Sequence, residues 1–374
     1  MKFNSLSLVI LGALFVALLS CEPGTEVKKL AFEHRIIDPD PPSANEGYLD
    51  VAAVGDLDGD GIEDIMIGSQ FTTGAVWYHS PTWERYPIGP GDFTTDGEIA
   101  DIDNDGDADL VMSTDSKDRV EWWENTGDPL QGGWVRHDIG SLFAHDMAVA
   151  DVNGDGRQDV AVFSKYGRVE LTVYLNPGAP DAAWQRIAIA EPEGEGLDLG
   201  DLDGDGDVDL TASRTWYENV DGDGKTWTVH TIVTNWGVDC RNICYDMNTD
   251  GKVDVVMSHS EGEGGLSWFE NPDWTEHKIE PGILVGAHTL EIGDFDSDGD
   301  PDVFTGEMHT SPEKRVLVYE NLGNDTWQRM VVDTAGTHNG RIGDIDGDGD
   351  IDLIGKNYDG RKVVEVWLNT LTSK

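Results

Sequence analysis

The chain has 374 residues, of which 73 are Asp or Glu and 25 are Lys or Arg, so its formal charge is −48. A field of this sign repels nucleic acid and anionic membrane surfaces, which are therefore poor candidate partners. Disorder is a poor explanation as well, because 13 Trp and an apolar fraction of 38% can build a core. The 45 Gly and 15 Pro, spread along the chain, predict many turns and short strands rather than long helices.

Residues 1–20 are predicted to be a signal peptide. The apolar run 6–19 is too short to span a membrane and ends just before Cys21. The segment 18–21 is similar to a bacterial lipobox, which implies that Cys21 is lipidated and that residues 21–27 form a tether. The protein would then be an exported lipoprotein of the outer membrane, cell surface or periplasm, in contact with the membrane only through its lipid. Ordinary signal cleavage is the alternative, because the second residue of that segment is Leu where a small residue is more usual.

A nine-residue pattern, D-x-[DN]-x-D-G-x-x-D, recurs seven times after this region. The copies begin 45 to 50 residues apart, the length of one repeated supersecondary unit. Oxygen-bearing side chains at positions 1, 3, 5 and 9 around a Gly predict a tight loop that holds Ca²⁺, a cation that takes six to eight oxygen ligands. The predicted calcium ligands, loop by loop, are Asp56, Asp58, Asp60 and Asp64; Asp101, Asp103, Asp105 and Asp109; Asp151, Asn153, Asp155 and Asp159; Asp201, Asp203, Asp205 and Asp209; Asp246, Asn248, Asp250 and Asp254; Asp294, Asp296, Asp298 and Asp302; and Asp344, Asp346, Asp348 and Asp352.

The EF-hand opens with the same pattern and is the main alternative for these loops. It needs Glu at position 12, where the first three copies carry Ile67, Met112 and Val162. The flanking segments, such as 51–54 and 65–67, are short and apolar and predict strands. The EF-hand is therefore rejected.

Two further motifs keep the sevenfold count. An aromatic strand follows every loop, and a fourth strand, starting at Trp83 in the first copy, follows six of them. The seventh copy lacks its fourth strand, but residues 32–37 have the same character. We therefore predict an all-β fold over residues 28–374: a seven-bladed β-propeller with four-stranded blades, closed by the N-terminal strand, with a calcium loop between strands one and two of each blade.

These loops resemble FG-GAP and VCBS repeats, as found in bacterial surface proteins and integrin-like propellers. The resemblance covers essentially all of residues 28–374 and implies about seven bound Ca²⁺. Similar propellers occur in bacterial sugar lyases and in enzymes of the aldosulose dehydratase type, which implies a uronic-acid polysaccharide or a keto-sugar as substrate. The resemblance does not choose between these activities and adhesion, because one fold hosts many functions.

The calcium loops mark one face of the propeller. Residues just before the first strand and just after the second strand of each blade must lie on the opposite face, around the central channel. Five of the ten His fall at this channel mouth, whereas the other five lie in outer or aromatic strands and are expected to be half-exposed sheet residues. The mouth histidines are His145, His259, His288, His309 and His338.

Part of this set can hold a transition metal, because imidazole with carboxylate suits Zn²⁺ or Mn²⁺. The predicted ligands come from blades five, six and seven. They are His259, His288, Glu307, His309 and His338.

The same mouth can also move protons, because His titrates near neutral pH. For an elimination we expect His145 or His259 as base, Tyr166 or Tyr358 as acid, and Arg214 or the metal as the group that stabilises an enolate. A hydrogen-bonded polar lining without chemistry is the alternative.

The leading hypothesis is an exported, calcium-stabilised, monomeric enzyme: a carbon–oxygen lyase or dehydratase acting on carbohydrate. The alternative is a non-catalytic surface propeller that binds glycan or protein. Trp122, Trp123, Trp216 and Trp236 could stack on sugars, although large aromatic residues more often fill cores. Whether Cys240 and Cys244 form a disulfide stays open, because four residues along a strand would hold them too far apart and a bridge would need a loop.

Overall fold

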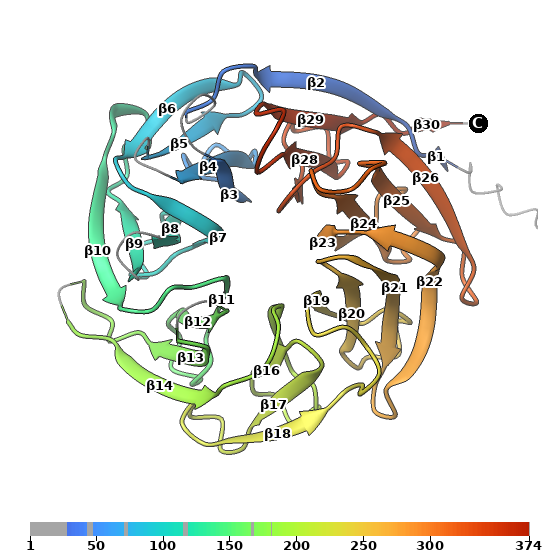
Figure 1. Cartoon of the computed structure of the whole chain (residues 1–374). Coiled ribbons are helices and arrows are strands. Elements are labelled where there is room, and N and C mark those ends of the chain that lie inside the picture. The colour runs from blue at the N-terminus through green and yellow to red at the C-terminus, as the bar shows by residue number, and fades with distance from the viewer. Residues whose placement is uncertain are drawn as a thin grey trace, which may run out of the picture.

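The computed structural model describes residues 28–42, 48–70, 74–114, 119–165, 168–180 and 182–373. Cys21 and the predicted signal and tether lie outside the described residues, and so does the predicted proton donor Tyr166. The described chain forms a ring of seven antiparallel, four-stranded sheets around a central axis (Figure 1). The predicted all-β, seven-bladed propeller is therefore confirmed.

The blades follow one another along the chain. Their strands are β3 (Tyr48–Gly55), β4 (Asp64–Gln70), β5 (Gly74–His79) and β6 (Glu84–Gly89); β7 (Phe93–Ala100), β8 (Asp109–Thr114), β9 (Arg119–Asn125) and β10 (Trp134–Gly140); β11 (Asp146–Ala150), β12 (Asp159–Ser164), β13 (Glu170–Leu175) and β14 (Gln185–Ala190); β15 (Leu197–Gly200), β16 (Asp209–Ala212), β17 (Thr215–Asn219) and β18 (Trp227–Thr231); β19 (Cys240–Tyr245), β20 (Asp254–His259), β21 (Glu263–Glu270) and β22 (Thr275–Val285); β23 (Ala287–Gly293), β24 (Asp302–Glu307), β25 (Val316–Asn321) and β26 (Trp327–Asp333); and β27 (Arg341–Gly343), β28 (Asp352–Lys356), β29 (Val364–Asn369) and β2 (Phe32–Asp38).

The seventh blade joins the two ends of the chain. Its strand order is β2-β29-β28-β27, and β2 pairs with β29 from Phe32 opposite Asn369 to Ile36 opposite Glu365. Figure 1 shows the blue strand β2 lying along the red strand β29 at the rim. A second pair, β1 (Lys28–Lys29) with β30 (Thr372–Ser373), extends this contact. The predicted closure by the N-terminal strand is confirmed, and it removes the open edges that a linear array of sheets would expose.

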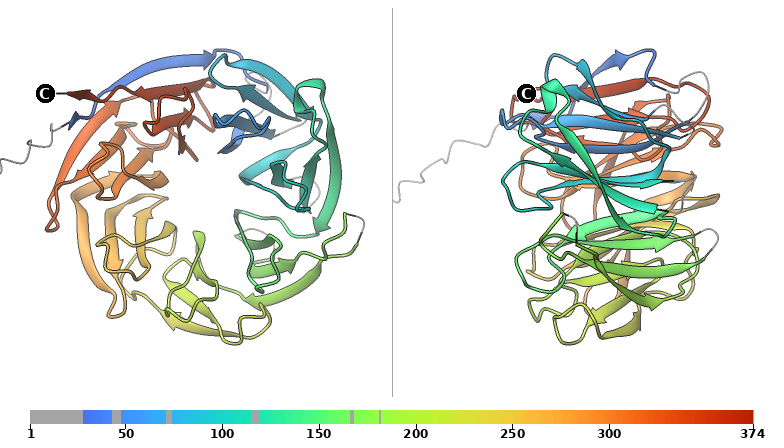
Figure 2. Two further views of the ribbon diagram at one scale, coloured as in Figure 1. Left: turned by 180° about the vertical axis from the view of Figure 1, so that it is seen from behind. Right: turned by 90° about the vertical axis from the view of Figure 1, so that its left-hand side faces the viewer.

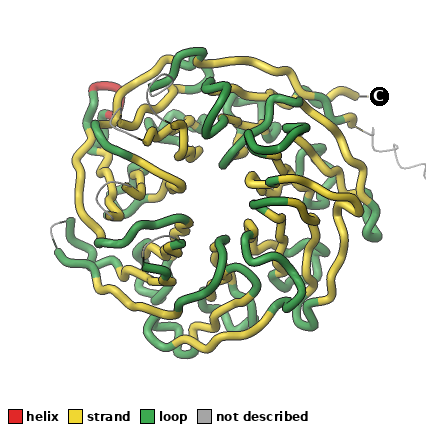
Figure 3. The backbone as a smooth tube through the Cα atoms, in the orientation of Figure 1, coloured by secondary structure: helices red, strands yellow, loops and turns green. Residues whose placement is uncertain are grey.

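Burial follows the position of a strand within its blade. The second strand β4 is buried at every residue, whereas the outer strand β10 is mostly exposed or half-buried. This gradient explains why the second strands are apolar runs and the fourth strands alternate with charged residues. Figure 3 shows strands and loops around the whole ring, with one short helical turn, η1 (Pro129–Gln131). No helix in the described chain is long and apolar enough to cross a bilayer.

The core lies between neighbouring blades. One apolar cluster, for example, joins Val111 and Trp122 of the second blade to Met147 and Val160 of the third. The Asn at the end of a blade's third strand adds a hydrogen bond between blades, on the face that carries the Asp-rich loops. Asn125 Nδ2 donates to the Leu57 carbonyl in the loop of the preceding blade at 2.8 Å, and four other blades repeat this bond. Each repeat therefore stabilises its neighbour as well as itself.

Four of the outer-strand histidines belong to this framework. Their rings stack on a third-strand Trp, and their Nε2 lies 2.7 to 3.0 Å from a Glu, as in His137 with Trp122 and Glu124. Trp122, Trp123 and Trp216 are buried, which makes them core residues rather than a sugar-stacking surface. Cys240 and Cys244 are both free thiols, at the first and fifth residues of β19.

Candidate functional site

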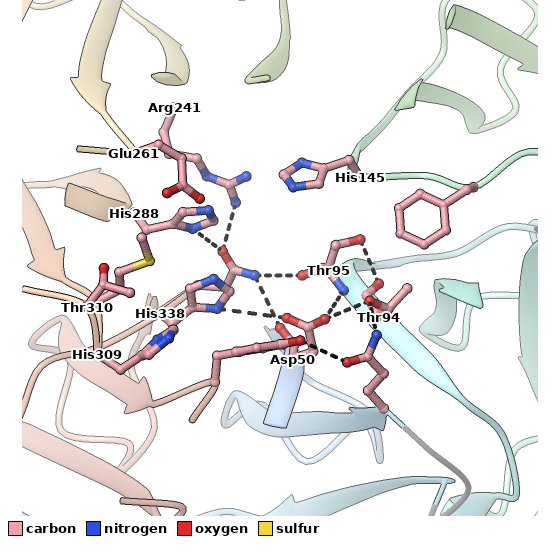
Figure 4. Close-up of a pocket in the computed structure, with 15 residues that line it drawn as sticks. Asp50, Thr94, Thr95, His145, Arg241, Glu261, His288, His309, Thr310 and His338 are labelled. Carbon is pink, nitrogen blue, oxygen red and sulfur yellow. Dashed lines mark hydrogen bonds and ion pairs between the residues drawn. The ribbon is translucent and has the colours of Figure 1, made fainter. Parts of the chain in front are cut away.

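A cavity of about 580 Å³ opens at the channel mouth, on the face opposite the Asp-rich loops. Figure 2 shows the ring from behind and from the side, with loops on both faces. Most of the residues that line the cavity lie at or just before the start of a first strand, or at or just after the end of a second strand, as the repeat count predicts. Five of the predicted residues meet there (Figure 4): His145, His288, His309, His338 and Tyr358.

Three other predicted residues do not line this cavity. His259 is held by the backbone, because the amide nitrogens of Gly237 and Gly265 lie 3.2 Å and 3.0 Å from its two ring nitrogens. Its ring also packs on Trp236, with centroids 4.4 Å apart. Both nitrogens are therefore engaged, and the expected roles of His259 as base and metal ligand do not agree with its position.

Glu307 and Arg214 are engaged elsewhere as well. Glu307 is fully buried, and its carboxylate accepts hydrogen bonds from the Arg315 guanidinium at 2.6 Å and 2.9 Å. Arg214 donates to the carbonyls of Thr234 and Trp236. The expected metal set of three blades therefore does not assemble as a unit, and Arg214 does not face the cavity as an enolate stabiliser.

The centre of the cavity wall is a pair of stacked imidazoles. The rings of His288 and His338 lie 4.2 Å apart at an interplanar angle of 21°. His288 Nδ1 lies 3.0 Å from the Asn339 side-chain oxygen. His338 adjoins His309 and Tyr358, with centroid distances of 6.4 Å and 5.4 Å.

Burial keeps both of these imidazoles neutral. It lowers the pKa of His288 to about 4, because the charged form would lose its water. The pKa of His338 falls well below its usual value for the same reason, with the neighbouring His288 adding to the effect. Both imidazoles are therefore neutral at physiological pH and have a lone pair that can accept a proton, but their low pKa makes them weaker bases than an ordinary His.

His145 is in the opposite state. Burial lowers its pKa, but Asp146, whose Oδ2 lies 3.2 Å from Nδ1, outweighs burial and raises the pKa of His145 above its usual value. The protonated form is therefore favoured. A protonated imidazole cannot take up a proton, so this environment does not support the expected role of His145 as base.

Asp50 is a functional candidate that received no role from the sequence. It is 2% exposed, and its Oδ2 accepts hydrogen bonds from the Thr94 hydroxyl at 2.7 Å and the Thr95 amide at 2.8 Å. Among the described residues its Oδ1 has no hydrogen-bond partner; it lies 3.9 Å from His338 Nδ1, which has none either, and both atoms are buried (Figure 4). The sequence does contain a signal for Asp50: this residue lies six residues before its Asp-rich loop, as His288 and His338 do before theirs.

Glu195 occupies the same repeat position in the fourth blade. Its buried carboxylate accepts a hydrogen bond from Lys165 Nζ at 2.6 Å and one from the Ser260 hydroxyl. His145 Nε2 and His288 Nε2 lie 3.4 Å and 3.8 Å from it. Burial alone would raise its pKa, but His145 and its other positive neighbours hold the pKa of Glu195 below the usual value. This carboxylate is therefore ionised.

Arg241 forms the floor of the cavity. It pairs with the buried Asp146 and reaches the Asn339 side-chain oxygen at 3.3 Å. Asn339 in turn donates to the carbonyls of Asp50 and Thr95. This layer crosses the channel, and Arg241 is the guanidinium that faces the cavity.

A second cavity of about 510 Å³ lies deeper in the channel, beyond Arg241. Four carboxylates, including Glu98 and Glu291, surround Arg341 there. Burial raises the pKa of Glu98 to about 8 and that of Glu291 to about 7. The lower channel is thus acidic and separated from the mouth by the Arg241 layer.

The donor set in the loops fits Ca²⁺. In the first loop, Asp56, Asp58 and Asp64 each offer a carboxylate oxygen, and these oxygens lie within 4.8 Å of one another. Asp60, at position 5 of this loop, is not part of that set. Its carboxylate oxygen lies within 4.8 Å of ligand atoms of Asp58 and His79 instead. Burial raises the pKa of Asp64 to about 7, and repulsion by Asp58 adds to the effect, so a divalent cation in this loop would stabilise the ionised carboxylates.

The cavity brings together a different metal-binding set from the predicted one. Glu195, Glu261 and His288 each offer one ligand atom within 4.8 Å of the others. Two carboxylates with an imidazole are donors that suit Zn²⁺ or Mn²⁺. Both oxygens of Glu195 already accept hydrogen bonds, from Lys165 and Ser260, so a metal there would compete with these donors.

The comparisons with known proteins match this architecture. The FG-GAP-like repeat family matches residues 56–112, 101–162, 151–212, 246–305 and 294–355, together more than half of the chain. No curated protein sequence matches.

Several solved structures share the fold. BBS1N, solved in complex with ARL6DN, is 12% identical with a TM-score of 0.57, and the match covers 92% of this chain and 97% of that one. Rhamnogalacturonan lyase YesW is 15% identical with a TM-score of 0.52, over 90% of this chain and 75% of that one. Sqt1 of Saccharomyces cerevisiae is 10% identical with a TM-score of 0.50, over 92% and 100% of the two chains. Likeness at these identities shows the fold alone.

Proposed function

The chain belongs to the FG-GAP-like repeat family, and from the chemistry of its cavity we propose that it is a carbohydrate-active lyase or dehydratase that works by β-elimination. One observation supports the proposal: the stacked, neutral imidazoles of His288 and His338 line the same cavity as Arg241 and Tyr358. A cavity with a few convergent polar groups and perturbed pKa values is the usual form of a binding or active site.

A β-elimination needs a base, an acid and a positive group, and it needs no oxidant or reductant. The base removes a proton from the carbon beside a carbonyl group, the carbon–oxygen bond at the next carbon breaks, a carbon–carbon double bond forms, and the leaving oxygen takes up a proton. Neutral His338 is suited to take the first proton. Asp50, whose Oδ1 lies 3.9 Å from Nδ1, would then stabilise the imidazolium that forms.

The remaining roles fall to groups on the same cavity wall. Tyr358 donates its hydroxyl to Gln70 Oε1 at 3.1 Å and is the candidate proton donor for the leaving oxygen. Arg241 is suited to stabilise the enolate oxygen, in place of the Arg214 expected from the sequence. Both a uronic-acid polysaccharide and a keto-sugar have the required proton next to a carbonyl group.

Metal ions enter this proposal in two separate places. Ca²⁺ would be held by the seven loops, where it supplies the positive charge that lets the carboxylates approach one another. A Zn²⁺ or Mn²⁺ at the mouth would be held by Glu195, Glu261 and His288 and would add a Lewis acid near the substrate. Export as a lipid-anchored monomer stays a prediction, because Cys21 lies outside the described residues.

The test compares catalysis with binding. The wild type and His338→Gln are incubated with uronic-acid glycans and keto-sugars, and the unsaturated product is followed by ultraviolet absorbance. We expect product from the wild type, loss of product in His338→Gln, and no change in His230→Gln, a matched substitution in the outer strand β18.

A non-catalytic glycan-binding propeller is the second candidate. The same polar cavity supports it, because side chains such as Arg241, Glu261 and Thr310 can bind hydroxyl groups without any reaction. Binding to the wild type with no product from any substrate would establish this function instead.

A further inference from the structure

The third strand of the first blade ends differently from the third strands of four other blades. Those four have Glu directly after the last aromatic residue of the strand: Glu124, Glu218, Glu270 and Glu320. The first blade has His79 there. In the second blade Glu124 lies 2.7 Å from His137 of the outer strand, but in the first blade Tyr86 takes the place of that His and stacks on Trp77. His79 therefore has no part in this framework and faces the Asp-rich loop of its own blade instead.

The hydrogen bonds of His79 fix which of its ring nitrogens faces the loop. The Thr82 hydroxyl donates its proton to the His79 carbonyl at 3.0 Å, so its oxygen accepts a hydrogen bond from the ring Nδ1, which lies 3.1 Å away. Nδ1 therefore carries a proton. The other nitrogen, Nε2, lies 3.0 Å from Asp58 Oδ2 and 3.6 Å from Asp60 Oδ2. A metal-ligating His is typically oriented by such a bond to its second nitrogen.

The two carboxylates are held in place by the backbone of the loop. Asp58 Oδ1 accepts a hydrogen bond from the Asp60 amide at 3.2 Å, and Asp60 Oδ1 accepts one from the Ile62 amide at 2.9 Å. Each side chain thus turns its Oδ2 toward His79 Nε2. The group is open to solvent, because the side chains of His79 and Asp60 are 23% and 39% exposed. An ion in solution can therefore reach it.

The distances and the imidazole indicate which kind of ion fits. Tetrahedral bonds from Zn²⁺ to nitrogen and oxygen, of about 2.0 to 2.2 Å, place neighbouring ligand atoms about 3.3 to 3.6 Å apart. The distances from His79 Nε2 to the two oxygens, 3.0 Å and 3.6 Å, are close to this separation. Ca²⁺ takes six to eight oxygen ligands at about 2.3 to 2.6 Å, whereas imidazole suits first-row transition metals. The imidazole therefore separates this group from the purely oxygen-bearing sets of the loops.

We propose that His79, Asp58 and Asp60 form a transition-metal site of the Zn²⁺ class in the first blade, beside the predicted calcium position. Asp58 also belongs to the set of Asp56 and Asp64, so its carboxylate would bridge the two ions. A water molecule would complete the tetrahedron. The ion would tie the loop to the end of β5. The inference is independent of the proposed lyase function, because none of its three ligands lines the cavity.

The experiment counts bound Zn²⁺ on the full chain by isothermal titration calorimetry in Ca²⁺-saturated buffer. We expect the wild type to bind one more Zn²⁺ per chain than His79→Gln, because the variant loses the only imidazole of the site. The mouth group of Glu195, Glu261 and His288 is present in both proteins and contributes equally to both titrations. Co²⁺ in place of Zn²⁺ should give stronger visible absorption, typical of tetrahedral Co²⁺, with the wild type than with His79→Gln.

A second pair of variants tests the orientation of the ring. Thr82→Val removes the hydroxyl that accepts from Nδ1 and should weaken Zn²⁺ binding at this site by about tenfold or more. Thr82→Ser keeps the hydroxyl and is the matched control, with affinity close to that of the wild type. If His79→Gln does not fold, His79→Glu replaces it, because four other blades carry Glu at this position. Three carboxylates without an imidazole should bind Zn²⁺ at least about tenfold more weakly.

Two results would overturn the inference. The first is an equal number of bound Zn²⁺, with equal affinity, in the wild type and the His79 variant. The second is Zn²⁺ binding to Thr82→Val as tight as binding to Thr82→Ser. Loss of one Zn²⁺ in the His79 variant, with weakened binding in Thr82→Val alone of the Thr82 pair, would establish the site whether or not the cavity catalyses an elimination.

Discussion

The two faces of this propeller use the repeat in opposite ways. On the loop face, seven copies of one nonapeptide place nearly the same oxygen donors in each blade. On the cavity face, the position six residues before each loop carries five different residue types across the seven blades. It holds Asp50, Thr95, His145, Glu195, Cys240, His288 and His338. The uniform positions build the ring, and the divergent ones, which the ring gathers around one axis, make a site that no single repeat contains.

The first and largest expected effect is on the loop face. Excess chelator should lower the melting temperature of the wild type by at least about 10 °C, because the binding energy of the loop ions is part of the folding energy. Differential scanning calorimetry with and without added Ca²⁺ measures it. An unchanged transition would show that the loops hold no stabilising ion.

The second prediction concerns closure of the ring. Deleting residues 28–38 removes β1 and β2, leaves β29 without its outer partner, and exposes a sheet edge. We expect a fall in melting temperature of about 10 °C or aggregation, followed by light scattering. A monomer of unchanged stability would mean that the six blades and the open seventh blade suffice.

The third prediction concerns His338 on the cavity face. His338→Gln should lower kcat/KM by about 100-fold or more, because the base is lost, while the melting temperature changes by no more than a few degrees. Steady-state kinetics and calorimetry on the same sample separate a loss of activity from a loss of stability. A drop in stability without a loss of activity would assign His338 to the framework.

The fourth prediction tests a residue that the structure places outside the site. Glu307→Gln removes the buried carboxylate that pairs with the half-buried Arg315, leaving that guanidinium only the exposed Glu313, and should cost about 2 kcal/mol of unfolding free energy. Activity per folded molecule should stay unchanged. Denaturant unfolding measures the change in stability. A 100-fold loss of kcat would show instead that Glu307 is one of the catalytic groups.

The smallest effect is expected from pH. A lowered pKa means that His338 stays in its neutral, proton-accepting form as the pH falls below about 6.5, the ordinary value for His. The acid limb of kcat/KM should therefore have its midpoint well below about 6.5, the value that a solvated imidazole would give. A midpoint at the ordinary value would show that another group is the base.

The sequence predicted the fold because its signals are periodic. The spacing of the Asp loops gives the number of blades, and residues 32–37 supply the strand that the seventh blade lacks. The same count placed His145, His288, His309, His338 and Tyr358 at one mouth. The position of a residue within its repeat is therefore enough to predict where its backbone lies in the ring.

What the sequence could not supply is the pairing of side chains within that mouth. Glu307 pairs with Arg315, which directly precedes β25, and His259 is held by the amides of Gly237 and Gly265. These partners come from connections that do not repeat. Asp50 was at the right repeat position, but its significance rests on an unpaired oxygen that only the three-dimensional arrangement reveals.

One measurement tests most directly whether the chemistry takes place on the cavity face. It compares the rate of unsaturated product formation by His338→Gln with that of the wild type, in Ca²⁺-saturated buffer where both are fully folded. The account predicts at least about a 100-fold loss of rate with an unchanged unfolding transition. Equal rates for the two proteins would contradict it, because chemistry would then lie away from the cavity.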